Sequence, residues 1–395
     1  MAAHRDDTDR RTFLQIAAAA SGLAVMGCPA SPERTDAAPR EMQYRPLGRT
    51  GLKVSEIAFG AHGVDNPPLA RAALDAGINT FCSSGQYLDG REEEALGQAL
   101  RESGRPREGL VLFTGNEVRP NASPRSVLDD IDASLRRLGT DYIDVYYAAM
   151  IRFPSELRVE PFHEAIQEAK RAGKVRHLGM SGHHGTMQEC MNAAIDDGRF
   201  EVFFIKYDFL SYPDQAGILR RAAERGIGTV VFKTNAGNRQ NEIADLEAGG
   251  LSFRQATVKW ALTNPDVASV AVTITNYGLL REVAAAVGSQ PTAPELGMLR
   301  RYREQMLDKV CRFCGTCEAE CPHGVAVADV MRYAMYFRYY GREKEAMRLY
   351  GELPRRGTAA ACAGCRGACD GACPFGRGVR ADLVEAHRLL RFPQA

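Results

Sequence analysis

Eight of the eleven cysteines lie in two short groups near the carboxyl end of the 395-residue chain. The first group has the spacing C-x2-C-x2-C-x3-C-P, and the second, C-x2-C-x3-C-x3-C-P, is one residue longer in the middle. Thiolates are the soft ligands that iron–sulfur clusters require, and the first spacing is typical of 4Fe–4S sites. The sequence therefore predicts two 4Fe–4S clusters and a redox protein. The eight predicted ligands are Cys311, Cys314, Cys317, Cys321, Cys362, Cys365, Cys369 and Cys373.

Zinc sites and disulfides are the competing interpretations of these cysteines. Clustered cysteines in a chain of this length indicate metal binding before a disulfide framework. Structural zinc sites are usually built from two separated pairs of ligands, whereas each group here is one run followed by proline. Glycines at Gly315, Gly364, Gly367 and Gly371 let backbone amides turn toward the sulfurs. The extra residue before Cys369 leaves an atypical or labile second cluster as an open alternative.

The segment before the cysteines must fold into the elements that position this chemistry. Between residues 44 and 289 a short β-like run is followed by a helical stretch, repeatedly. Eight such units are typical of a (β/α)8 TIM barrel, an α/β fold. A doubly wound open sheet is the alternative, but the early G-x-G-x-x-G turn of a dinucleotide-binding sheet is missing. The expected strands are 55–60, 78–83, 110–114, 142–148, 175–181, 202–207, 228–233 and 268–273, and the expected helices include 91–101, 125–138 and 160–171.

The first forty residues have the character of an export signal and a tether. An arginine pair, Arg10 and Arg11, precedes Phe-Leu and an apolar, alanine-rich stretch that ends at Cys28. This pattern is similar to a twin-arginine signal, and residues 25–28 are similar to a lipoprotein cleavage box. We therefore expect export by the twin-arginine route to the periplasm, and Cys28 is the candidate for a lipid anchor there. A cytosolic protein with an alanine-rich tail is the alternative.

Bulk composition excludes several function classes. The chain is 45% hydrophobic and 25% charged, as is ordinary for a globular protein. Its formal net charge of +1 gives no field that would attract nucleic acid or an anionic membrane. No apolar run in the sequence reaches the roughly 18 residues that span a bilayer. We expect no nucleic-acid partner.

The repeated segments resemble the aldo/keto reductase family. The likeness rests on Tyr87 and on residues 44–55, 73–81, 94–97, 138–144 and 173–181, which occur in the family's order. It implies a barrel that reduces carbonyls with NADPH through a tyrosine acid, an aspartate, a lysine and a histidine. These four groups are expected at the carboxyl ends of barrel strands.

Three of these four catalytic positions are replaced. The resemblance assigns the tyrosine to Tyr87, whereas the aspartate falls on Cys82, the lysine on Gly115 and the histidine on Ala149. A free tyrosine has a pKa of about 10, and a neighbouring ammonium normally favours its ionised form. Because no lysine follows Thr114, nothing visible in the sequence tunes Tyr87. We expect ordinary carbonyl reduction to be severely impaired.

The positions that would bind NADP(H) are also altered. The resemblance assigns cofactor contacts to Ser181, Phe232, Lys233, Gly237 and Glu282, with Phe232 stacking on the nicotinamide and Gly237 admitting the pyrophosphate. However, Gly182 replaces an asparagine, Val272 and Thr273 replace Pro-Gly, and Val283 replaces another asparagine. Binding of NADP(H) is therefore left open. Cys82 is a weaker candidate for a reactive thiol or a ligand at the barrel mouth, and the pair His183 and His184 for metal or substrate binding. The ordinary alternatives are a small apolar residue for Cys82 and solvated or capping side chains for the histidines.

The cysteine runs resemble those of ferredoxins with two clusters, and the helical pattern at 327–350 resembles the helical ferredoxin modules of respiratory enzymes. By that resemblance Cys373 completes the first cluster and Cys321 completes the second. It implies three parts, namely a signal and tether at 1–40, the barrel at 41–290 and a mainly helical ferredoxin-type domain at 291–395.

The leading hypothesis is an iron–sulfur oxidoreductase in which the clusters exchange electrons with a barrel-bound small molecule or with an electron-transfer partner. The alternatives are a non-catalytic barrel that serves as a scaffold or binding module, and a weak NADPH-dependent carbonyl reductase.

Overall fold

The computed structural model describes residues 41–182, 186–210, 215–235, 243, 246–247, 250–306 and 310–391. The predicted signal with Arg10, Arg11 and Cys28 lies outside these residues, as do His183, His184 and Gly237. Within the described ranges, no helix has both the length and the apolar character needed to span a bilayer.

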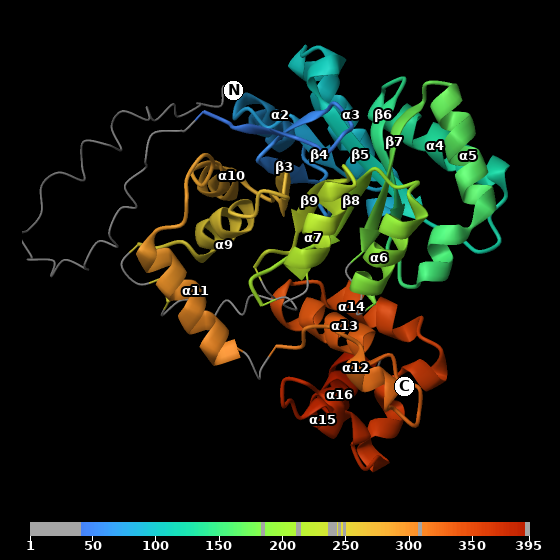
Figure 1. Cartoon of the computed structure of the whole chain (residues 1–395), viewed down its shortest axis with the longest axis vertical. Helices are drawn as coiled ribbons and strands as arrows, with labels where there is room; N and C mark the ends of the chain where they lie inside the picture. Colours follow the sequence, from blue (N-terminus) through green and yellow to red (C-terminus); the bar gives the residue numbers. More distant parts are fainter. Residues whose placement is uncertain are drawn as a thin grey trace, which may run out of the picture. The chain divides into compact units, whose positions relative to one another are not determined.

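Eight parallel strands close into a barrel in the order β10-β3-β4-β5-β6-β7-β8-β9, which confirms the predicted fold. Each strand pairs with its neighbours in sequence because a helix returns the chain to the same end of the barrel each time (Figure 1). The strands are β3 (Ile57–Gly60), β4 (Thr80–Cys82), β5 (Val111–Glu117), β6 (Ile143–Ala149), β7 (Val175–Gly182), β8 (Val202–Lys206), β9 (Gly228–Phe232) and β10 (Ser269–Thr273).

A hairpin of β1 (Tyr44–Pro46) and β2 (Lys53–Ser55) precedes the barrel. The first barrel strand begins at Ile57 rather than at Ser55, because Ser55 pairs with Tyr44 in the hairpin. The outer helices are α2 (Pro67–Asp75), α3 (Arg91–Ser103), α4 (Pro124–Leu138), α5 (Glu160–Arg171), α6 (Met187–Asp197), α7 (Gln215–Glu224), α9 (Phe253–Leu262) and α10 (Tyr277–Ala284).

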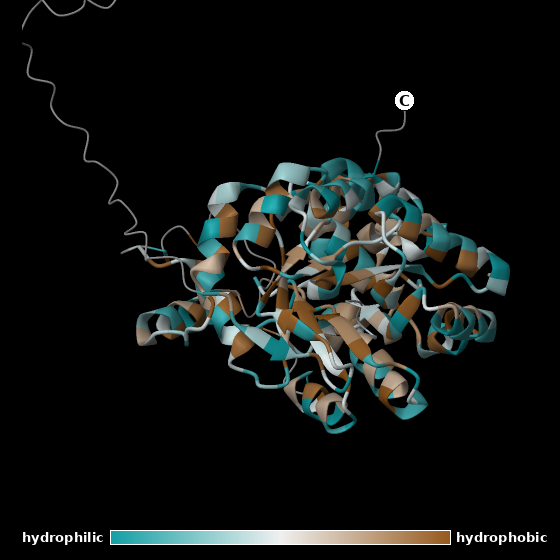
Figure 2. Ribbon diagram, turned by 90° about the horizontal axis from the view of Figure 1, so that it is seen from above, coloured by the Kyte–Doolittle hydropathy of each residue, from teal (hydrophilic) through white to brown (hydrophobic). Residues whose placement is uncertain are grey.

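The barrel has an apolar layer on each face of its sheet. The layer between strands and helices includes Ile131, Ile166 and Leu219, which are all fully buried. The inner layer is aromatic near the carboxyl ends of the strands, where the Phe204 ring lies 5.4 Å from that of Tyr147 and 4.7 Å from that of Phe232. Figure 2 accordingly shows hydrophobic strands enclosed by helices with hydrophilic outer faces. The barrel is therefore a packed core rather than an open channel.

A buried carboxylate joins β5, β6 and β7 near their amino ends. Asp144 is fully buried, and its two carboxylate oxygens lie 2.7 Å from Arg107 and 3.1 Å from Arg176. The two guanidinium groups lie 3.9 and 3.8 Å from the centre of the Tyr142 ring. Asp144 also accepts a hydrogen bond of 3.0 Å from the backbone of Leu112. The group ties three strands together at the end opposite the barrel mouth.

The rest of the chain is mainly helical, as predicted. The helices are α11 (Ala293–Met306), α12 (Thr316–Ala319), α13 (Val327–Tyr339), α14 (Glu343–Gly351), α15 (Ala368–Ala372) and α16 (Val379–Leu390). The helical pattern at 327–350 corresponds to α13 and α14, and Gly341 adopts a φ of 62° between the two helices. Helix α11 packs on α9 through Met298, Tyr302 and Phe253, whereas α12 to α16 share a separate core.

Candidate functional site

Four of the cysteine thiols surround one small cavity. Cys311, Cys314 and Cys317 come from the first run, and Cys373 is the last cysteine of the second run. The chain brings Cys373 here because helices α12 and α15, which carry Cys317 and Cys369, pack against each other. The rest of the cavity wall is largely apolar and includes Val327, Met331, Phe375 and Val379.

The other four thiols form a second group. Burial and the neighbouring thiols of Cys321, Cys369 and Cys365 raise the pKa of Cys362 to about 11. Cys321 therefore lies beside the second run, although it belongs to the first run in sequence. This exchange of Cys321 and Cys373 is the arrangement that the resemblance to two-cluster ferredoxins implies.

The donor set and its surroundings fit 4Fe–4S clusters. Three cysteine sulfurs each accept a backbone hydrogen bond of 3.4 Å. Cys311 accepts it from the amide of Phe313, Cys321 from that of Val325, and Cys365 from that of Gly367. Such amides stabilise negative charge on a cluster's thiolates. The ten cysteines that the structure describes are all free thiols. In the same part of the chain no three His, Cys, Asp or Glu side chains are grouped closely enough to hold a single metal ion. The four thiols of the first group surround a space rather than meet at a point.

The barrel mouth contains Tyr87, the predicted catalytic acid. Its ring centre lies 4.2 Å from that of His62, which follows β3. Burial, followed by the Glu92 carboxylate, raises the pKa of Tyr87 well above its usual value of 10. Burial also raises the pKa of the Cys82 thiol, which ends β4. Tyr87 thus holds its proton tightly, which is unfavourable for a general acid near neutral pH.

Gly115 has no room for a side chain. A Cβ atom at this position would lie 1.9 Å from the carbonyl oxygen of Tyr147 and 2.9 Å from its ring. The Tyr147 hydroxyl donates a hydrogen bond to the carbonyl group of Ser83, which follows β4. The neighbouring strand therefore occupies the space that a lysine at 115 would need. Ala149, at the end of β6, is buried and carries no donor.

Unusual backbone conformations gather around this region. Among the described residues, positive φ angles at non-glycine positions occur at Leu88, Asp89, Met150, Lys233 and Phe313. The first four follow barrel strands, and Phe313 lies inside the first cysteine run. A bulky residue in this conformation is strained, and such strain tends to gather at functional sites.

Of the predicted cofactor residues, the structure describes Ser181, Phe232, Lys233 and Glu282, and each is buried or contacts other parts of the protein. Phe232 packs against Phe204, and the Lys233 ammonium donates a hydrogen bond of 2.8 Å to the Tyr336 hydroxyl. Glu282 accepts a hydrogen bond from Ser252, and Ser181 is buried at the end of β7. Lys233 thus contacts the helical part of the chain directly.

Comparison with known proteins identifies the barrel. The aldo/keto reductase family pattern matches residues 65–240. Versiconal hemiacetal acetate reductase of Aspergillus parasiticus is 24% identical over 335 aligned positions, which cover 65% of this chain and 96% of that protein. Aldo-keto reductase YhdN of Bacillus subtilis is 30% identical over 159 positions, which cover 35% of this chain and 47% of that protein.

The barrel contains an aldo/keto reductase family domain. A solved structure of aldo-keto reductase AKR11C1 from Bacillus halodurans has the same fold, with a TM-score of 0.54 and 21% identity over 66% of this chain and 96% of that one. The described helices α12 to α16 lie beyond the residues that the family pattern matches.

Several residues at the mouth of the aldo/keto reductase domain were not predicted from the sequence. Glu92 is fully buried on α3, and burial raises its pKa to about 8. Burial, followed by Arg342 and Lys233, lowers the pKa of His62 to about 3. Tyr336 and Arg342 reach the mouth from the helical part of the chain. No motif in the sequence predicts this contact between distant segments. An acidic residue in the first turn of a helix, such as Glu92, is also too common to be a signal.

Proposed function

We propose that this protein is an iron–sulfur oxidoreductase in which two 4Fe–4S clusters exchange electrons with a group bound at the mouth of the aldo/keto reductase domain. One observation carries the proposal. Cys311, a ligand of the first proposed cluster, lines the four-cysteine cavity and also a second cavity at the ends of barrel strands β8 and β9. A cluster held by Cys311 would therefore be a direct neighbour of the barrel mouth.

In this proposal Cys311, Cys314, Cys317 and Cys373 hold one cluster, and Cys362, Cys365, Cys369 and Cys321 hold the other. When bound, the clusters supply one-electron chemistry. The backbone amides of Phe313, Val325 and Gly367 would balance negative charge on the ligating sulfurs. The apolar walls of the first cavity, including Val327 and Val379, would keep water away from the cluster.

The state of the barrel mouth supports redox chemistry of this kind over hydride transfer from NADPH. Tyr87 retains its proton, Gly115 leaves no room for a lysine, and Lys233 is engaged by Tyr336. The same features also favour a second candidate, a non-catalytic barrel that positions the clusters for an electron-transfer partner. We further propose export by the twin-arginine route, because that route carries folded proteins with their metal centres in place.

Iron and acid-labile sulfide analysis of oxygen-free holoprotein tests the proposal. Two clusters correspond to about eight irons and eight sulfides per chain, and electron paramagnetic resonance of the reduced protein should show a 4Fe–4S signal. The variant Cys190→Ala is the control, since Cys190 is a buried thiol on α6 far from both runs in sequence. Zinc alone, or no metal, would refute the assignment. Bleaching of the clusters by NADPH would favour a catalytic barrel over the scaffold.

A further inference from the structure

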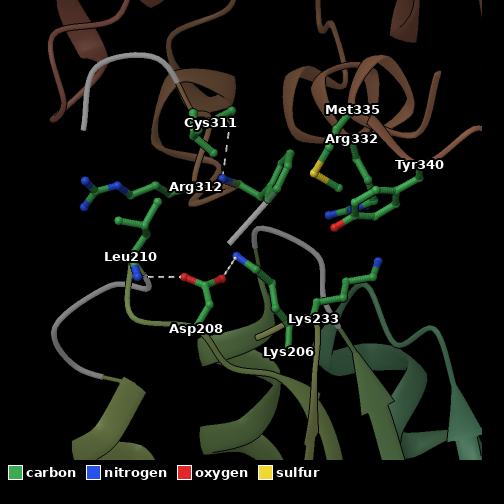
Figure 3. Close-up of a pocket in the computed structure, with 11 residues that line it drawn as sticks. Lys206, Asp208, Leu210, Lys233, Cys311, Arg312, Arg332, Met335 and Tyr340 are labelled. Carbon is green, nitrogen blue, oxygen red and sulfur yellow. Dashed lines mark hydrogen bonds and ion pairs between the residues drawn. The ribbon is translucent and has the colours of Figure 1, made fainter. Parts of the chain in front are cut away.

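The two groups of cysteine thiols have different surroundings. In the first group, Cys311 also lines a narrow cavity with Lys206 and Asp208 at the end of β8, so this group adjoins the barrel (Figure 3). Its other walls include the buried side chains of Val327 and Val379. The second group consists of Cys321, Cys362, Cys365 and Cys369, and many of the residues beside it in the chain are exposed. The second group is therefore the better placed of the two to exchange electrons with another protein.

Small residues flank the cysteines of the second group. Cys362 and Cys369 are buried, and Cys365 is partly exposed. The residues between and beside these cysteines are mostly alanine and glycine, and the exposed ones are Ala360, Ala361, Ala363, Gly364, Ala368 and Gly371. None of these six has a side chain larger than a methyl group, so the surface of another protein can approach the second group closely. Electron transfer between proteins requires such a short separation.

Hydrogen bonds from α14 and α16 hold this stretch of backbone in place. The amide of Ala359 donates a hydrogen bond of 2.9 Å to the hydroxyl of Tyr350 on α14. Arg380, on α16, donates hydrogen bonds of 3.0 Å to the carbonyl oxygen of Cys362 and of 2.9 Å to that of Ala363. A surface that is already ordered loses less conformational entropy when a partner binds, which favours association.

The same stretch carries unpaired positive charge. Residues 353–369 contain three arginines, Arg355, Arg356 and Arg366, and no aspartate or glutamate. All three arginines are exposed, and none forms an ion pair or a side-chain hydrogen bond within the part of the chain that the structure describes. Arg366 directly follows Cys365, so at least one of these charges lies beside the second group.

The acidic residues that border this stretch leave the three arginines unmatched. Glu352 lies 2.5 Å from Arg348, and the two form an exposed pair of their own. Asp370 accepts a hydrogen bond of 2.8 Å from the backbone amide of Arg380. The Arg380 guanidinium adds a further positive charge beside Cys362. Even where Asp370 offsets Arg380, the positive charge of the three exposed arginines remains.

We infer that residues 353–371 form the docking surface for an acidic protein that carries one electron at a time. Carboxylates of the carrier lie against Arg355, Arg356 and Arg366, while its redox group approaches the exposed alanines. Complementary charge of this kind mainly orients the partners and speeds their encounter, and arginine is enriched at protein interfaces. One electron passes between the carrier and the second group, and no bond or proton is transferred. The passage of the electron rests on the proposed function, whereas the charged surface does not.

Calorimetric titration of the oxygen-free holoprotein with an acidic flavodoxin tests the inference, and a basic cytochrome c is the comparison probe. At low ionic strength we expect flavodoxin to bind and cytochrome c to bind far more weakly. Raising the salt to about 0.15 M should weaken flavodoxin binding, because exposed charges are then screened. Arg355→Gln combined with Arg356→Gln should weaken it about tenfold, because two positive charges are lost from the surface.

A second pair of adjacent arginines provides the matched control. Arg300 and Arg301 are both exposed on α11, and Arg300→Gln combined with Arg301→Gln should leave flavodoxin binding unchanged. Asp370→Asn gives a change of opposite sign, since it removes a negative charge beside the docking surface and should tighten binding. These variants replace exposed side chains, and none of them removes a cysteine.

Three binding results would overturn the inference. The first is no binding of flavodoxin, and the second is an equal loss of affinity in the two double arginine variants. The third is arginine-dependent binding of phosphatidylglycerol vesicles that is tighter than that of flavodoxin, which would indicate a membrane surface as the partner. Stopped-flow mixing of reduced flavodoxin with oxidised protein, and the reverse mixture, gives a further test. Binding with electron exchange in neither direction would also overturn the inference.

Iron and sulfide content measured on the same sample separates this inference from the proposed function. Iron-loaded protein that binds no flavodoxin would contradict the inference alone. Protein that contains no iron even when prepared without oxygen would contradict the proposed function, and the electron transfer with it, whether or not the arginines bind flavodoxin.

Discussion

The side chains of Lys233 and Tyr336 form a hydrogen bond of 2.8 Å between the residue that follows β9 and helix α13. This contact joins the barrel mouth to the helices that carry the cysteines. Arg342, also from the helical part, acts on the same region, because its positive charge contributes to the lowered pKa values of both His62 and Lys233. The electrostatics of the mouth are therefore set by two parts of the chain that are about a hundred residues apart in sequence.

Loss of the Tyr336 hydroxyl should destabilise the protein. Tyr336→Phe leaves a buried ammonium without its acceptor, at a cost of about 1–3 kcal/mol in the free energy of unfolding. Urea unfolding followed by circular dichroism measures this loss. Tyr277→Phe, at a tyrosine that is 46% exposed, should change stability by less than about 0.5 kcal/mol. Equal effects of the two variants would contradict the burial argument.

Glu92 should make stability fall as the pH rises. Burial raises its folded-state pKa from 4.5 to about 8, so between these values the folded protein keeps a proton that the unfolded chain has lost. The free energy of unfolding therefore decreases as the pH rises from about 4.5 to about 8. The variant Glu92→Gln cannot ionise at this position. Its free energy of unfolding, compared with that of the wild type, should therefore increase by about 1.4 kcal/mol for each pH unit in this range. Thermal melts at pH 5 and pH 9 test this, with the exposed Glu94→Gln as the control.

Removal of the Asp144 charge should be among the most damaging changes in the barrel. Asp144→Asn leaves Arg107 and Arg176 stacked on Tyr142 without their counter-ion, and breaking a buried pair in this way costs about 3–5 kcal/mol. The matched control is Asp129→Asn, which breaks an ion pair with Arg125 on the surface of α4. We expect the control to cost less than about 1 kcal/mol. Denaturant midpoints of the two variants should therefore differ clearly.

Double cysteine variants can test which thiols share a cluster. If Cys321 serves the second cluster, Cys321→Ser combined with Cys362→Ser should lose no more iron than either change alone. Cys321→Ser combined with Cys311→Ser should lose the iron of both clusters. Iron content and paramagnetic resonance of these variants provide the measurement. The reverse pattern would place Cys321 with its own run.

A methyl group at Gly115 should not be tolerated. Gly115→Ala places its Cβ 1.9 Å from the Tyr147 carbonyl oxygen, so the strands must separate, at a cost of about 1–3 kcal/mol. Gly217→Ala on α7 meets no atom within 4 Å and should be neutral or slightly stabilising. Chemical unfolding of both variants gives the comparison. A wild-type midpoint for Gly115→Ala would show that β5 and β6 can move apart easily.

The barrel could be predicted from the sequence because its signals are local. Strand runs such as 175–181 alternate with amphipathic helices such as α5, and the structure confirms all eight strands within a few residues. The cysteine motifs could likewise be recognised in the sequence, because each motif lies within one short segment. The mouth could not be predicted, because it depends on contacts between distant residues. The family resemblance assigns a lysine position to Gly115, but only the fold shows that the carbonyl oxygen of Tyr147 lies where a side chain would begin.

The packing of Tyr147 against Gly115 also bears on how such a barrel can evolve. Regaining the missing lysine by mutation at this position would force a long side chain into a neighbouring backbone. Because the obstacle is the carbonyl oxygen of Tyr147, a smaller side chain at 147 would not remove it, and the pairing of β5 with β6 would first have to shift. A single substitution at this position therefore cannot restore a long side chain, because two strands of the barrel would have to change together.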